Sequence, residues 1–64
     1  MDRMEQLFNR ADRAYQLAID IRCEAVRSVP LRRIRLERRI NILLDYRNKC
    51  MFQWNKLYET ANNI

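Results

Sequence analysis

Basic side chains are the groups in this sequence best suited to chemistry, and most of them lie in its second half. Residues 29–64 carry eight of the thirteen Lys and Arg against three acidic residues, whereas residues 1–28 carry five of each sign. The whole net charge of +5 therefore belongs to the second half. A guanidinium group forms paired hydrogen bonds with phosphate or carboxylate oxygens, so this half of the chain is suited to an anionic partner.

If the second half is helical, its cations gather on one side. On a helical wheel, five of them fall within a sector of about 100°. Tyr46 and Gln53 lie between them, where a phenol can stack or donate and an amide offers hydrogen bonds to phosphate. We predict that the protein has a surface that binds DNA or RNA. It consists of Arg35, Arg38, Arg39, Tyr46, Lys49, Gln53 and Lys56.

Two other interpretations of this charge pattern stay open. The chain could be a protein adaptor or inhibitor, of the phage or plasmid type of small regulator, that docks on an acidic protein surface. Such a partner would depend on one or two anchors such as Phe52 or Tyr46. The basic side could also be a solvated helix face, since every amphipathic helix needs polar residues somewhere. A membrane-surface role is not expected, because the apolar sides are needed for packing.

Enzymatic chemistry has little support in this composition. The chain has no His and no Gly, and Ser28 and Thr60 are its single Ser and Thr. A hydroxyl or thiol nucleophile would lack an imidazole to activate it, and no glycine-rich loop can cradle a phosphate. We therefore expect a non-enzymatic protein with no cofactor, no small-molecule substrate and no catalytic residue.

The two cysteines do not form a metal or redox motif. Cys23 and Cys50 are far apart in the sequence, without a C-x-x-C pair or a histidine. A structural zinc site needs four ligands, so no metal site is predicted. We expect two free, partly buried thiols that are too far apart for an intrachain disulfide. A disulfide between chains stays open.

Apolar periodicity indicates two helices that position these groups. Apolar residues recur at intervals of three and four over about 2–28 and again over about 30–62. Val29-Pro30 interrupts the pattern, because proline disfavours helical geometry in the residue before it and favours the first position of a new helix. We predict an all-α fold, a two-helix antiparallel hairpin that forms one domain over residues 1–64. One long helix kinked at Pro30 is the alternative.

The apolar side of each helix is wider than one neighbour can cover. Its sector spans about 160° on the wheel, which favours two hairpins associating into a homodimeric four-helix bundle. Ala11, Ala18 and Ala25 recur every seven residues and allow a close approach of the first helix. The predicted hairpin or dimer core consists of Leu7, Ala11, Ala14, Ala18, Ile21, Ala25, Leu36, Ile40, Leu43, Leu44, Met51, Trp54, Leu57 and Tyr58.

Two arginines, Arg22 and Arg47, fall inside the apolar sectors. With the turn centred near Val29-Pro30, residues whose numbers sum to about 59 lie at the same level of the hairpin. This register predicts ion pairs between Arg22 and Glu37 and between Arg47 and Asp12. Such pairs would specify the register more than they stabilise it.

The length, the two-helix layout and the alanine-spaced seam resemble the repressor of primer family in architecture. The resemblance implies a dimeric four-helix bundle that binds paired RNA loops. It rests on no residue motif, so it assigns no site residue here.

No stretch of the sequence has the length of a signal peptide or a membrane span. The longest apolar runs, such as Leu17-Ala18-Ile19, are three residues. A signal peptide has an apolar region of about 7–15 residues, and a spanning helix has about 20. We therefore expect a cytoplasmic protein.

Overall fold

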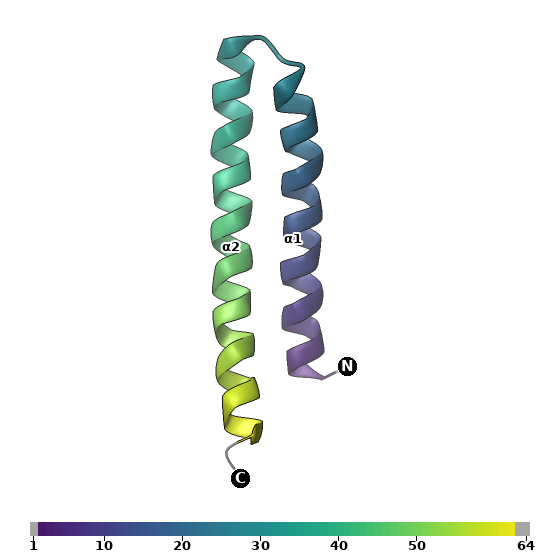
Figure 1. Ribbon diagram of the computed structural model, residues 1–64, viewed down its shortest axis with the longest axis vertical. Coiled ribbons are helices and arrows are strands. Elements are labelled where there is room, and N and C mark those ends of the chain that lie inside the picture. The colour runs from purple at the N-terminus through teal and green to yellow at the C-terminus, as the bar shows by residue number, and fades with distance from the viewer. Residues whose placement is uncertain (1, 63–64) are drawn as a thin grey trace.

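The computed structural model describes residues 2–62, and the remaining residues of the predicted domain, 1, 63 and 64, lie outside this range. Helices α1 (Arg3–Val26) and α2 (Pro30–Asn62) run antiparallel and pack along their lengths (Figure 1). The predicted helical hairpin is therefore confirmed, and the single kinked helix is wrong. The hairpin is extended, with Cα dimensions of 53 × 17 × 12 Å.

The turn follows from local hydrogen bonds around Ser28. The Ser28 hydroxyl donates to the Glu24 carbonyl at 2.8 Å, and the Ser28 amide donates to the Ala25 carbonyl at 3.1 Å. These bonds end α1 at Val26, two residues before the predicted end. No described residue has a positive φ angle, so the chain reverses direction without a glycine.

Proline begins the second helix. Pro30 is the first residue of α2, where its fixed φ suits a helix and its missing amide leaves no helical bond unmade. The first turn of α2 closes when the Arg33 amide donates to the Val29 carbonyl at 2.9 Å. At the other end of the hairpin, Glu5 lies in the first turn of α1, where the helix dipole favours negative charge.

The core is one narrow seam between the helices. Its positions in α1 alternate spacings of four and three residues, as in a coiled coil, and so do those in α2. Leu7 and Ala11 of α1 cluster with Cys50 of α2, with Met51 and Trp54 packed beside them. The buried residues are Leu7, Ala11, Ala14, Ala18, Ala25, Leu36, Ile40 and Cys50. Alanine dominates the α1 side, so the seam buries little apolar volume.

The predicted core residues differ in burial, and the exposed ones lie near the end of α2 that extends beyond α1. Seven of them are buried, and Ile21, Leu43, Leu44, Met51 and Trp54 are half-buried. Leu57 and Tyr58 are exposed in the single hairpin. The 33 residues of α2 extend beyond the start of the 24-residue α1, so α1 covers little of this end. There Trp54 and Tyr58 stack with ring centroids 5.2 Å apart.

The cysteines differ from the sequence-based expectation in one respect. Both thiols are free, as predicted. However, Cys50 is buried in the seam, whereas Cys23 is exposed rather than partly buried. Cys50 occupies a seam position of α2, while Cys23 lies on the side of α1 that faces away from the seam.

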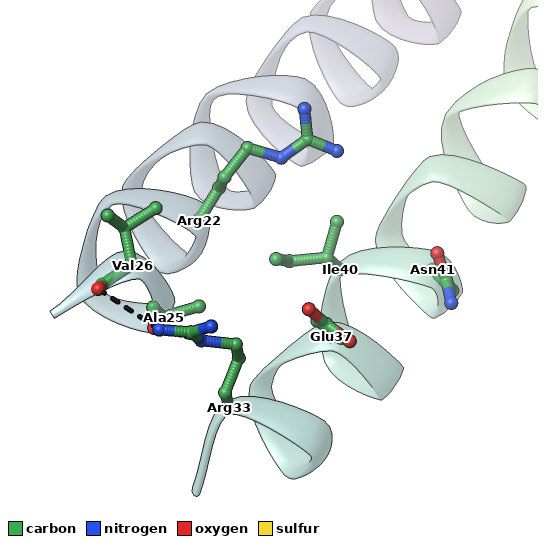
Figure 2. A pocket seen from close by; sticks show the side chains of 7 residues that line it. All are labelled: Arg22, Ala25, Val26, Arg33, Glu37, Ile40 and Asn41. Carbon is green, nitrogen blue, oxygen red and sulfur yellow. Dashed lines mark hydrogen bonds between the residues drawn. The ribbon is translucent and has the colours of Figure 1, made fainter. Parts of the chain in front are cut away.

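The two predicted ion pairs are wrong. Over residues 2–62, the ion pairs are Arg32–Glu24 and Lys49–Asp45. Arg47 instead lies over the ring of Tyr15, with its guanidinium carbon 5.0 Å from the ring centroid. Arg22 and Glu37 lie at the same level but do not touch. In Figure 2 the Ile40 side chain is seen between them.

Candidate nucleic-acid interface

Five cations form a row along the outer side of α2, which we call the basic row: Arg35, Arg38, Arg39, Lys49 and Lys56. All five side chains are exposed. Their spacings place them on one side of a regular helix, and at 1.5 Å per residue the row spans about 32 Å. Its straightness comes from α2, a single unbroken helix of 33 residues.

Two neighbouring arginines contact the carboxyl end of α1 and are not part of the basic row. Arg32 forms an ion pair with Glu24 of α1. Arg33 reaches across to the carboxyl end of α1, where it donates to the Ala25 carbonyl at 3.2 Å and the Val26 carbonyl at 3.4 Å (Figure 2). A cation at this end of a helix stabilises the dipole and satisfies carbonyls that have no helical donor.

Most of the basic row has no acidic partner inside the hairpin. Arg35, Arg38 and Arg39 form no ion pair with any residue that the structure describes. Lys49 pairs with Asp45 at 3.2 Å, and both of these side chains are about 70% exposed. Lys56 lies over the Phe52 ring at 4.7 Å from its centroid. Solvent-exposed pairs of this kind are weak, so the row keeps its positive charge for a partner.

The two polar residues predicted beside the row have accessible side chains. Tyr46 is 45% exposed and Gln53 is exposed. Neither engages another described residue through a hydrogen bond, an ion pair or a ring contact. Both side chains are therefore available for stacking or hydrogen bonding on the surface that the sequence indicated.

Apolar side chains border the basic row, a feature that the charge pattern alone did not predict. Arg39 lines an open groove with Leu17 and Ile21 of α1 and Ile42 and Leu43 of α2. A second open groove near the turn includes Leu31, Arg35 and Arg39. The hairpin register could have indicated the first groove, because it places Leu17 level with Leu43. The surface can thus combine charged and apolar contacts.

The other side of the hairpin holds a different hollow, of about 450 Å³ (Figure 2). Ala25 and Ile40 form its floor at the seam. Arg22, Val26, Arg33, Glu37 and Asn41 complete its lining. A neighbouring hollow along the seam shares Arg22 and Ile40 and adds Tyr15, Ala18, Ile19 and Leu44. The small alanine side chains leave this side concave.

Comparisons with protein family models, curated proteins and solved structures find no match to this chain. Over the described residues, neither helix combines the length and the apolar character that crossing a membrane requires. No group of three or more potential metal-ligating side chains occurs in residues 2–62. The surfaces of the hairpin are therefore the features that indicate a function.

Proposed function

We propose that the protein is a non-enzymatic regulator that binds the phosphate backbone of a nucleic acid through the basic row. The observation that carries this proposal is the separation of the arginines into two sets. Arg32 and Arg33 are engaged by α1, whereas Arg35, Arg38 and Arg39 are exposed and have no carboxylate partner among the described residues. Cations that the fold does not use are suited to an external anion.

The row is suited to a backbone contact because its charges are spread along a rod. Five cations over about 32 Å can meet successive phosphates of a strand or groove edge. Phosphate contacts release counterions, so affinity falls as salt rises. For five contacts on duplex DNA, binding should weaken about 500-fold between 50 and 200 mM salt. A smaller decrease in affinity over this range of salt would indicate fewer phosphate contacts.

The test is a titration of labelled duplex DNA, single-stranded DNA and structured RNA at these two salt concentrations. The variant Arg35→Gln/Arg38→Gln/Arg39→Gln removes the row's unpaired arginines. The matched control, Arg10→Gln/Arg13→Gln/Arg27→Gln, also lowers the net charge of +5 by three units but leaves the row intact. We expect the first variant to lose most of its affinity and the control to lose much less.

Equal losses in the two variants would show that only net charge matters, which would contradict a defined surface. Absence of binding at 50 mM salt would also reject the proposal. The preferred nucleic acid among the three probes identifies the substrate class. Circular dichroism of both variants establishes that the helices are intact.

A protein partner with an acidic surface is the second candidate. Phe52 is 61% exposed beside the row, and Lys56 lies over its ring. An exposed aromatic residue next to a cation is a common anchor in protein interfaces. For this candidate, Phe52→Ala would abolish partner binding, whereas it should change nucleic-acid affinity by less than the triple glutamine variant does.

We also propose that two hairpins associate into a four-helix bundle. Many large apolar side chains remain exposed, among them Phe8, Ile19 and Val26. The accessible surface of 5447 Å² exceeds the value for a compact globular chain of this mass, about 4,400 Å². The excess of about 1,000 Å² is close to what one partner contributes to a standard interface, about 800 Å². A second copy would cover it.

A further inference from the structure

The hairpin has two broad sides, and one of them is built to receive helices. We call it the Tyr15 face, and its members in α1 are Phe8, Tyr15, Ile19, Arg22 and Val26. Its members in α2 are Glu37, Asn41, Leu44 and Met51. The hollow at Ala25 (Figure 2) and the neighbouring hollow at Ala18 lie along its centre line. Large side chains on both rims and small ones in the middle form a groove.

Charges on this face are complementary but do not meet within one chain. Arg22 and Glu37 lie at the same level on opposite walls of a hollow and form no ion pair with each other. Asp12 and Arg47 share a second level nearer the chain ends, and they too are not paired. Each level therefore presents one acid and one base on different helices.

We infer that a second copy of this chain docks on the Tyr15 face, with a two-fold axis parallel to the long axis of the hairpin. This inference rests on the proposed association of two copies and specifies its face and orientation. Such an axis places α1 of each copy over α2 of the other, with both turns at the same end. Arg22 then meets Glu37 of the partner subunit, and Asp12 lies at the level of Arg47 of the partner subunit.

The same arrangement also matches the apolar residues. Levels are preserved by this axis, so Tyr15 meets Leu44 of the partner subunit and Phe8 meets Met51 of the partner subunit. These residues are exposed or half-buried in the single hairpin. Their burial stabilises the dimer through the hydrophobic effect. The charges favour the orientation in which α1 of one copy lies over α2 of the other.

A two-fold axis perpendicular to the long axis of the hairpin, in the plane of the interface, would not produce this match. It would set α1 against α1 of the partner in the opposite direction. Arg22 and Glu37 would then lie on helices that do not face each other across the interface, so Arg22 would not meet Glu37 of the partner subunit. The observed charges therefore favour the axis along the hairpin, which also leaves both basic rows uncovered.

The test uses two single variants with reversed charges, Arg22→Glu and Glu37→Arg, in sedimentation equilibrium without nucleic acid. Each variant alone brings two like charges together twice per dimer, so its dimer Kd should rise about tenfold or more. An equimolar mixture should recover wild-type association, because both contacts of the heterodimer are then favourable. Native mass spectrometry identifies the heterodimer by its mass.

The control pair is Arg13→Glu and Asp20→Arg, which reverse charges away from the Tyr15 face and should leave the dimer Kd unchanged. If the wild type stays monomeric at 100 μM, on the order of a hundred-thousand-fold weaker than a nanomolar complex, both the association and this docking mode are wrong. If the wild type dimerises but mixing restores nothing, only the face and orientation are wrong. Loss of nucleic-acid binding has no bearing on either result.

Discussion

Arg47 of α2 lies over the Tyr15 ring of α1, with its guanidinium carbon 5.0 Å from the ring centroid. Arg47 occupies a seam position between Leu43 and Cys50, where a coiled coil normally has an apolar residue. The aromatic face accepts the charge and the aliphatic stem covers its neighbours. The hairpin thereby accommodates a cation in its seam without a carboxylate.

A double-mutant cycle of Arg47→Met and Tyr15→Leu should show a coupling free energy of about 0.5–1 kcal/mol, because the Tyr15 ring and the half-buried Arg47 stabilise each other. Urea unfolding at one fixed chain concentration measures it. The exposed pair Lys56 and Phe52 provides the control cycle, where the coupling should be at the low end of this range or below it. A coupling of zero for Arg47 and Tyr15 would contradict the contact.

Arg33 should contribute more to stability than any arginine of the basic row. Its guanidinium donates to two carbonyls at the end of α1. Arg33→Met should therefore lower the free energy of unfolding by about 1 kcal/mol. Arg38→Met, which removes an exposed arginine of the same helix, should change it by less than about 0.5 kcal/mol. Equal effects would show that the cap is unimportant.

Larger side chains in the alanine seam should destabilise the hairpin. Ala18 is 3% exposed, so Ala18→Leu has to push the helices apart and should destabilise the hairpin by about 1–3 kcal/mol. Ala61→Leu adds the same atoms at an exposed position of α2 and should be close to neutral. Thermal unfolding of the two variants compares them directly. A stabilising Ala18→Leu would mean that the seam is loosely packed.

The two cysteines should respond differently to the same change. Cys50 is buried against Leu7 and Ala11, and a hydroxyl there would lose its hydrogen bonds to water. Cys50→Ser should destabilise the hairpin by about 1–3 kcal/mol, whereas Cys23→Ser should be neutral within about 0.5 kcal/mol. A thiol reagent offers an independent measurement, since it should label Cys23 quickly and Cys50 only after unfolding. Equal labelling rates would contradict the observed burial.

Much of the fold was predictable because it depends on local rules. Apolar spacings of three and four residues report directly on helical geometry, and Pro30 alone marks where the second helix begins. The same arithmetic places Ala25 beside Arg33 and Leu7 beside Cys50, as observed. The exposure of the basic row follows equally from its position beside the seam and outside the apolar sector.

Tertiary structure alone decided which partners the long side chains choose. Arg32 and Arg33 fall outside the predicted surface, and only the packed turn shows that they contact Glu24 and the carboxyl end of α1. Arg47 was expected at Asp12 and is found on Tyr15. An arginine side chain can reach several groups that attract it similarly at the same level of a hairpin. The register therefore limits its possible partners but does not determine which one it contacts. Backbone periodicity determines where a helix lies, whereas the final contact depends on rotamers and on the space that neighbouring side chains leave.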